Sequence, residues 1–430
     1  MFRTSKRSLE PRLGLAFRAT DKTALRVGFA RYITPVAMAQ AFETQDPPFY
    51  GYTAQTYTAP LVEGIPVTQL GDPFNSKNPI ILPLQKSLGR YQNLGDKAAW
   101  DAQDFNTVAS YRINFTVQQQ IPGNTMLEAT WFVNRSSNVP YSKPLNMVDP
   151  NLTYTYKGAL DRSVANPFYN YLTPDKFPGP LRYRQAVSVG NLLRPYPQYL
   201  DLTQLLTARR DDHYEALQLR VQRQFSKGLS LLWTYSYNRE QTGEFFNDLD
   251  LFADRTTFID SNNPRHRSNF AGTYDLPFGK SRRFLSNANA IVNGIFGGWS
   301  FSWIFMYNSG EFIRFGQMIV KGNPAISNPT RSRYFDTSVF APPQPYTPRT
   351  NPWQFPGVTG PRFANMDSTL AKYFPLGERF HAELRVEAYN LTNSFMASNP
   401  NNDVYSSLFG RSTGQANRGR EMQYTFRLHF

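Results

Sequence analysis

An all-β fold, made of antiparallel strands that cross a membrane as part of a barrel, is predicted by three features of the 430-residue sequence. Segments of alternating apolar and polar residues recur along the chain, short and long connections alternate between them, and the last segment ends on an aromatic residue. A period of two gives a strand one apolar and one polar face. A wall between lipid and a water-filled lumen requires two such faces.

The final segment, residues 420–430, shows the pattern without a break. Its apolar side chains would share one face of a strand: Met422, Tyr424, Phe426, Leu428 and Phe430. A tilted strand crosses a bilayer in about 9–11 residues, which matches the length of this segment. The terminal phenylalanine also resembles the carboxy-terminal sorting signal of outer-membrane barrel proteins. Taken alone, the segment would also suit an edge strand of a soluble β-sandwich, although the membrane strand is favoured.

Ten further segments share this two-faced pattern, so we predict about eleven strands. They lie within residues 13–17, 25–29, 109–118, 127–133, 217–225, 229–237, 270–276, 299–307, 370–374 and 380–388. The connections after even-numbered strands are long, namely residues 34–106, 135–212, 241–264, 310–365 and 392–418. Those after odd-numbered strands are short, except around residues 280–297. Long extracellular loops and short periplasmic turns alternate in this way in outer-membrane barrels, which places the carboxy terminus on the periplasmic side.

Composition excludes several classes of protein. The chain has no cysteine, which rules out a disulfide framework and thiolate metal sites. Its net charge of +14 would suit nucleic acid, but the basic residues are scattered and form no dense run. Lipopolysaccharide phosphates would suit such a surface equally well, so we expect no nucleic-acid partner. Abundant phenylalanine and tyrosine, with frequent asparagine, proline and glycine, favour strands and loops over helices.

No motif for catalysis is present in the sequence. The four histidines, none of them in a zinc-binding spacing, are His213, His266, His381 and His429. His381 and His429 fall in the polar register of their strands. Because nucleophile elbows and nucleotide-binding glycine loops are also absent, we expect no enzyme, no cofactor and no metal site.

Two groups of charged residues leave alternatives open. Asp248, Asp250 and Asp254 could supply oxygen ligands to Ca²⁺, although a solvated loop explains the same acidic residues more simply. A group of four arginines could contact the lumen or lipid phosphates, or be solvated in periplasmic turns: Arg265, Arg267, Arg282 and Arg283.

The long connections are rich in proline, asparagine, tyrosine and glycine, for example at 47–52, 166–171 and 342–346. Connections longer than about 15 residues are usually functional or disordered. Two interpretations remain open: the loops pack on one another through their aromatic rings, or they form a vestibule that captures ligands by stacking. The sequence does not identify ligand-binding residues.

Several segments resemble a known family, the TonB-dependent outer-membrane transporters, in their carboxy-terminal half. The resemblance is strongest for the Oar-like type, which carries a carboxypeptidase-regulatory-like domain. The similar segments are residues 11–17 with 21–29, His266-Arg267-Ser268-Asn269-Phe270, Leu276-Pro277-Phe278-Gly279-Lys280, Gly297-Gly298-Trp299, Arg385-Val386-Glu387-Ala388-Tyr389-Asn390-Leu391-Thr392-Asn393, and Gly419-Arg420-Glu421-Met422-Gln423.

The resemblance implies a larger protein. That family places a β-sandwich, a TonB box and a plug domain ahead of a barrel of about 22 strands. We therefore expect residues 1–430 to be the carboxy-terminal part of the barrel domain, without plug, TonB box or signal peptide. Unpaired strand edges are costly in lipid, so we expect a fragment in which Met1 is an internal start or a gene-model start. The alternative is a smaller complete barrel with unrecognised strands in residues 34–106 and 135–212.

The function implied by the resemblance is TonB-dependent uptake of a large ligand, such as an oligosaccharide or a peptide, across the outer membrane of a Gram-negative cell. The implied partners are outer-membrane lipid, lipopolysaccharide and the barrel-assembly machinery. The TonB complex would engage the protein only through the plug region. One alternative is an adhesive or structural surface protein whose loops bind a partner without transport. Another is a soluble β-rich binding protein.

Overall fold

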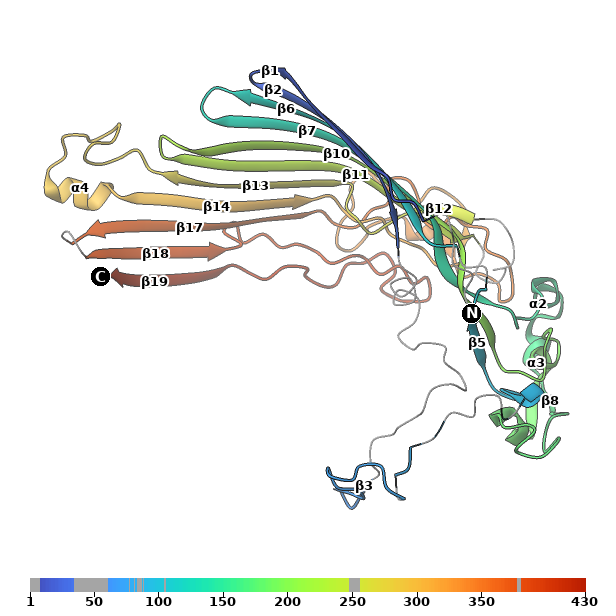
Figure 1. Ribbon diagram of the computed structural model, residues 1–430. Coiled ribbons are helices and arrows are strands. Elements are labelled where there is room, and N and C mark those ends of the chain that lie inside the picture. The colour runs from blue at the N-terminus through green and yellow to red at the C-terminus, as the bar shows by residue number, and fades with distance from the viewer. Residues whose placement is uncertain are drawn as a thin grey trace.

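A single large sheet dominates the computed structural model, which describes residues 8–34, 61–76, 78–80, 82, 87, 89–103, 106–246, 256–376 and 380–430. The sheet has thirteen strands, of which eleven form one continuous path from β1 to β19 (Figure 1). The path follows the order of the chain, and its neighbours are antiparallel, as in an up-and-down barrel.

Each of the eleven path strands overlaps one predicted segment, so the predicted all-β antiparallel fold is confirmed. The strands are β1 (Arg12–Thr20), β2 (Thr23–Ile33), β6 (Ala109–Ile121), β7 (Thr125–Pro144), β10 (Leu202–Ser226), β11 (Leu229–Phe245), β13 (His266–Asp275), β14 (Trp299–Asn308), β17 (Phe363–Pro375), β18 (His381–Tyr389) and β19 (Glu421–His429).

The short connections lie together at one end of the sheet, beside the carboxy terminus, and the long ones lie at the other end (Figure 1). A two-residue turn joins β10 to β11, where Lys227 and Gly228 have φ angles of 50° and 80°. Two successive residues of positive φ match the right-handed twist of a hairpin, which is why glycine is favoured there. The predicted alternation of short turns and long loops is thereby confirmed.

Three strands are longer than predicted, because they continue into connections that were expected to be loops. β7 ends at Pro144 and β10 begins at Leu202, so the two ends of the predicted connection 135–212 are strand. β11 likewise continues into the predicted connection 241–264, where it pairs with β12 (Thr256–Asp260). Asp211 and Asp212, at the end of the predicted connection 135–212, lie inside β10. Beyond the membrane both faces of a strand are wet, so backbone pairing continues after the apolar alternation has stopped.

The remaining elements are short and lie in the connections. The strands are β3 (Leu61–Val62), β4 (Ile65–Pro66), β5 (Ala98–Asp101), β8 (Ser163–Ala165), β9 (Ala186–Ser188), β15 (Ile319–Val320) and β16 (Phe340–Ala341). The helices are α2 (Pro150–Tyr156), α3 (Val189–Leu192) and α4 (Ala290–Phe296), with 3-10 turns η1 (Gly89–Tyr91), η2 (Lys157–Asp161), η3 (Pro180–Tyr183) and η4 (Thr337–Val339).

None of these short strands lengthens the path within the described residues, where β5 runs parallel to β10. β1 and β19 are the two ends of the path, so each has a single strand neighbour in the described part of the chain. Among the described helices, none has the length and apolar character needed to cross a membrane.

The strand register separates two faces. On the outer face, apolar side chains align across strands in a row formed by Leu15, Val27, Phe115, Trp131, Leu217 and Tyr237. A second such row holds Tyr274, Phe301, Leu370, Val386 and Tyr424. On the inner face, the neighbouring row is Arg26, Thr116, Thr130, Gln218, Ser236, Arg267 and Asn308. One face is therefore suited to lipid and the other to a wet lumen.

The final strand follows the same division. Met422, Tyr424, Phe426 and Leu428 lie on the outer face of β19, and Phe430 follows the end of the strand. Tyr424 and Phe426 are 72% and 68% exposed, as expected for side chains that face lipid. Their role as a sorting signal remains a prediction.

Candidate functional site: the inner face and its extracellular cap

Pairs of short hydroxyl side chains on the inner face join neighbouring strands. The Oγ1 atoms of Thr116 and Thr130 lie 2.9 Å apart, and those of Thr273 and Ser302 Oγ lie 3.0 Å apart. Each contact gives both hydroxyls a hydrogen-bond partner on the neighbouring strand. This part of the wall is therefore polar.

A charged network lies on the inner face near the carboxy terminus. The carboxylate of Glu383 accepts hydrogen bonds from Arg385, 2.8 Å from Nε, and lies 3.5 Å from Nε2 of His429. Arg385 also lies 3.7 Å from the carboxylate of Glu387. The Glu383 side chain is only 4% exposed, so it needs these partners. His381 pairs with His429 across the strands, which confirms that both histidines lie on the polar face.

Asn390, in the motif that runs from Arg385 to Asn393, organises the extracellular end of β18. Its backbone has a φ of 52°, and its N–H donates to the carboxylate of Asp367 at 2.8 Å. Its buried side-chain amide donates to the carbonyls of Ser394 and Arg418, at 3.1 and 3.0 Å. One side chain therefore joins β18 to the segment that leads into β19, so this part of the family motif is structural.

We predict that Asn390→Ala destabilises the protein by about 2–4 kcal/mol, since buried carbonyls lose their donor and alanine is strained at positive φ. Asn390→Gly, which tolerates that φ, should cost less. Urea unfolding in lipid vesicles, followed by tryptophan fluorescence, measures both variants. Equal losses for alanine and glycine would show that backbone strain contributes nothing here.

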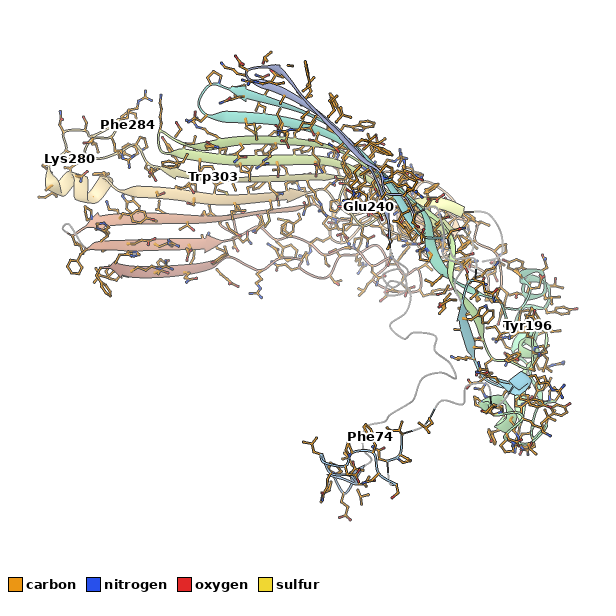
Figure 2. The ribbon with its side chains drawn as sticks, in the orientation of Figure 1. Phe74, Tyr196, Glu240, Lys280, Phe284 and Trp303 are labelled. Atoms are coloured by element: carbon orange, nitrogen blue, oxygen red, sulfur yellow. The ribbon has the colours of Figure 1, made fainter. Side chains whose placement is uncertain are left out.

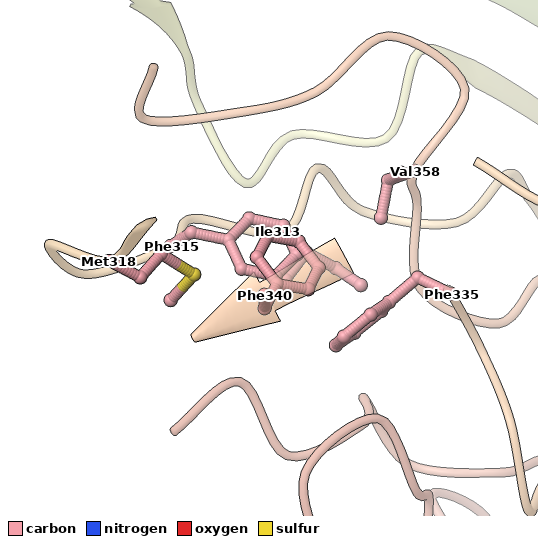
Figure 3. Close-up of a cluster of buried hydrophobic side chains, with 6 residues drawn as sticks. All are labelled: Ile313, Phe315, Met318, Phe335, Phe340 and Val358. Atoms are coloured by element: carbon pink, nitrogen blue, oxygen red, sulfur yellow. The ribbon is translucent and has the colours of Figure 1, made fainter. Parts of the chain in front are cut away.

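The extracellular connections fold into two apolar cores, of which the first lies between residues 309–362 and 390–420. We call it the central loop core, and it consists of Ile313, Phe315, Met318, Phe335, Phe340 and Val358 (Figure 3). Phe335 is fully buried, with its ring centroid 5.1 Å from those of both Phe315 and Phe409. Because Phe409 comes from the later connection, the two loops are held as one unit.

A second core, the peripheral loop core, consists of Phe177, Leu181 and Val187, with Leu94 packed against it. It joins the connection 145–201 to the segment before β6. Gly179 and Gly95 approach so closely that a Cβ at Gly179 would lie 2.1 Å from the carbonyl carbon of Gly95. Only glycine fits there, because any larger residue would clash with that backbone. The Gly179 N–H also donates to the Leu94 carbonyl at 2.9 Å.

The central loop core is attached to the barrel through β11 and β12. The indole of Trp353 donates to the carbonyl of Phe245 at 3.2 Å, and Gln354 makes two hydrogen bonds to the backbone of Asp260 at 2.7 and 2.9 Å. The guanidinium of Arg349 lies 3.6 Å above the Trp353 ring. Glu240, on the inner face, marks the level where the sheet meets these loops (Figure 2). The loops therefore form a packed cap.

Some aromatic side chains of the described loops pack against other rings, and others are exposed. In the stretch 166–171, Phe168 stacks on Phe177, whereas Tyr169 and Tyr171 remain 42% and 56% exposed. The connection 145–201 exposes five tyrosines in all, namely Tyr156, Tyr169, Tyr171, Tyr183 and Tyr196, the last of which is labelled in Figure 2. Packing by aromatic rings is thus observed, and a separate set of rings stays available. The aromatic stretch 47–52 lies outside the described residues.

Two loop contacts perturb titratable groups. The Tyr346 hydroxyl, from the stretch 342–346, donates to the carboxylate of Asp161, and this bond raises the pKa of Tyr346. The contact links connection 309–362 to connection 145–201. In η4, the Ser338 hydroxyl donates to Asp336 at 2.7 Å and lowers the pKa of that carboxyl. Both contacts are hydrogen bonds to carboxylates within the cap.

The other histidines have aromatic neighbours. The His213 ring stacks on Phe258 with centroids 4.4 Å apart, and Nδ1 of His266 lies 2.8 Å from the Tyr235 hydroxyl. In the described part of the chain, no three side chains of histidine, aspartate or glutamate gather in a way that could hold a metal ion. The acidic group at Asp248, Asp250 and Asp254 lies outside the described residues.

Comparison with protein families places the chain. A family model described as an outer membrane beta barrel domain matches residues 1–423. The chain therefore belongs to the outer-membrane β-barrel domain family, and the outer membrane is its location. This membership overturns the two soluble alternatives, the β-sandwich and the soluble binding protein. A search of curated proteins found no match to the chain.

Solved structures with a similar course of the chain are outer-membrane receptors. The outer membrane transporter YddB from Escherichia coli is 9% identical, with a TM-score of 0.44, and the match covers 96% of this chain and 39% of that one. The siderophore receptor PirA from Acinetobacter baumannii is 10% identical, with a TM-score of 0.43, covering 98% and 40%. The ferripyoverdine receptor of Pseudomonas aeruginosa is 8% identical, with a TM-score of 0.41, covering 98% and 32%. The chain thus spans about a third of the length of that receptor.

Proposed function

We propose that the chain forms barrel wall and extracellular cap in a TonB-dependent receptor, of the Oar-like type, that takes up a large ligand such as an oligosaccharide or a peptide. The family-like segments support the receptor class. The polar inner face supports a passage for solutes, and the packed loops at its extracellular end support a capture surface. The TonB complex supplies the energy through the plug region of such receptors.

The observation that carries the ligand class is the set of exposed tyrosines on connection 145–201. Tyrosine offers a flat apolar ring with a polar hydroxyl, which suits sugar faces and peptide side chains. The peripheral loop core fixes this connection through Phe177, Leu181 and Val187. A surface that is already ordered loses less entropy when it binds.

We predict that Tyr171→Ala and Tyr183→Ala each weaken ligand binding about two- to tenfold, the expected cost of one stacking ring. Tyr405→Ala is the matched control, because Tyr405 is also exposed but lies on connection 390–420. Titration of the detergent-solubilised protein with labelled neutral oligosaccharides and short peptides measures the effect. Equal losses for all three variants would argue against a site on connection 145–201.

A second candidate function, favoured by the same exposed tyrosines, is adhesion without transport. Transport depends on energy supplied by TonB, whereas adhesion does not. Transport requires that cells carrying the protein accumulate the bound oligosaccharide or peptide, and that removal of TonB abolishes accumulation while surface binding persists. Binding that persists with no accumulation in either strain would support adhesion and contradict transport.

The remaining partners follow from the location. A barrel in the outer membrane contacts lipid on its apolar face, and we propose lipopolysaccharide as the neighbour of its extracellular basic residues. The barrel-assembly machinery would read the final strand, through Met422, Tyr424, Phe426, Leu428 and Phe430.

A further inference from the structure

The β13–β14 connection, residues 276–298, is longer than the other connections at this end of the sheet. We call it the turn assembly. Two segments of family-like sequence meet in it, because a Cβ on Gly279 would lie 2.7 Å from the Cα of Gly297. The Lys280 N–H donates to Oδ1 of Asn293 at 2.7 Å, and the rings of Phe278 and Phe284 lie 5.6 Å apart. The turn assembly is therefore a folded unit.

Helix α4, inside the turn assembly, exposes its apolar side chains and turns a polar one toward the protein, the opposite of a helix on the surface of a soluble protein. Its apolar side chains Ile291, Ile295 and Phe296 are 74%, 57% and 52% exposed. Its polar Asn293 instead turns to the protein, where it binds Lys280. Burial of a side chain such as isoleucine is worth about 1.5–3 kcal/mol. An apolar surrounding is therefore the environment that this helix fits.

The turn assembly adjoins the lipid-facing side of the sheet. Trp299 and Lys372 are register partners on the outer face, in the row that continues to Leu384 and Phe426. The indole of Trp299 donates to the Ile295 carbonyl at 2.9 Å. The ammonium of Lys372 donates to the same carbonyl at 3.3 Å and to the carbonyl of Gly297. The end of α4 is thus tied to outer-face side chains, so its apolar surface is continuous with the lipid-facing band.

Lys372 is buried where the end of α4 meets the outer face of the sheet. Its side chain is only 3% exposed although it lies in an otherwise apolar row. The ammonium lies 5.3 Å from the Trp299 ring centroid and 5.1 Å from that of Phe374. Carbonyl oxygens at the end of α4 and two aromatic rings therefore offset the free-energy cost of placing the Lys372 ammonium on the outer face.

The charge of the turn assembly has one sign. Residues 276–298 contain Lys280, Arg282 and Arg283 and no acidic residue. Arg282 lies 3.7 Å from the carboxylate of Asp275, whereas within the described residues no carboxylate lies within 4 Å of Lys280 or Arg283. Both of these residues are exposed, and Lys280 lies with Phe284 at the outermost end of the molecule (Figure 2). This surface fits an anionic partner next to an apolar one.

We propose that the turn assembly binds anionic phospholipid of the periplasmic leaflet. Ile291, Ile295 and Phe296 enter the boundary between headgroups and acyl chains, and Lys280 and Arg283 contact the phosphates. Interfacial amphipathic helices bind membranes through this combination of apolar area and basic charge. A membrane is favoured over a periplasmic protein because the apolar surface continues the lipid-facing band of β14 and β17.

The first test is the depth of the helix in a bilayer. The chain has no cysteine, so Ile295→Cys can carry a single environment-sensitive fluorophore in the full chain, reconstituted into phosphatidylglycerol-containing vesicles. We expect quenching by nitroxide-bearing lipid and protection from aqueous iodide. Lys22→Cys, in the exposed β1–β2 turn, is the matched control and should show the reverse. Equal iodide quenching at both positions would overturn the proposal.

The second test separates charge from apolar contact. Lys280→Gln and Arg283→Gln should each reduce the preference for spin-labelled phosphatidylglycerol over phosphatidylcholine by about fivefold, the expected effect of one basic residue near a membrane surface. Lys22→Gln should leave it unchanged. Heat-modifiable migration on a gel verifies that every variant is folded. An unaltered preference in both folded variants would overturn the assignment of the phosphate contacts.

Discussion

Replacement of Leu217 by arginine is expected to destabilise the barrel by about 2–4 kcal/mol, the cost of an arginine on the lipid face near the membrane midplane. Leu217 lies in the apolar row between Trp131 and Tyr237 on the outer face of β10. Leu217 is 43% exposed, so the expected loss of stability does not come from disrupting a tightly packed core. Urea unfolding in vesicles measures the change in free energy.

The adjacent residue supplies the control. Gln218 lies on the inner face, between Thr130 and Ser236, and is also exposed. Gln218→Arg places the same charge in the wet lumen, one residue away, and should change the stability by less than about 1 kcal/mol. A large loss at Gln218 with none at Leu217 would reverse the assignment of the two faces.

Truncation of Phe335 to alanine should destabilise the extracellular cap by about 3–5 kcal/mol, the usual cost of removing a buried phenylalanine. Phe335 lies at the centre of the central loop core, where its ring contacts those of Phe315, Phe340 and Phe409. Because two connections share this core, hydrogen exchange should increase in both 309–362 and 390–420. The strands should keep their protection.

Phe177→Ala is the matched control, since Phe177 is buried to the same degree in the peripheral loop core. It should increase exchange in connection 145–201 and leave 309–362 and 390–420 protected. If each substitution loosened all the loops together, the cap would be one cooperative unit and the division into two cores would be wrong.

The path strands could be predicted from the sequence because lipid imposes a simple rule on them. Most residues at alternate positions are apolar where a strand crosses the lipid, and the row through Leu15, Val27 and Phe115 follows that rule. The rule ends at the membrane surface, which explains why the ends of β7, β10 and β11 were expected to be loops. There the backbone ladder continues with residues such as Asp212 that carry no alternation.

The contacts of the cap and of the turn assembly could not be predicted, because they join residues far apart in sequence. Phe335 and Phe409 come from different connections, and Lys372 reaches the carbonyl of Ile295, 77 residues earlier. A period of two describes one strand at a time and carries no information about such pairs. In the sequence Lys372 is only a break in an apolar row, and its carbonyl partners explain why the break is tolerated.

The two-faced wall of β10 is tested most directly by cysteine scanning from Leu217 to Gln222 in intact outer membranes, with a water-soluble maleimide. The native chain has no cysteine, so each label reports one position. The cysteines at 218, 220 and 222 should react and those at 217, 219 and 221 should be protected. Reaction at every position, or the opposite alternation, would contradict a strand that separates lipid from a wet lumen.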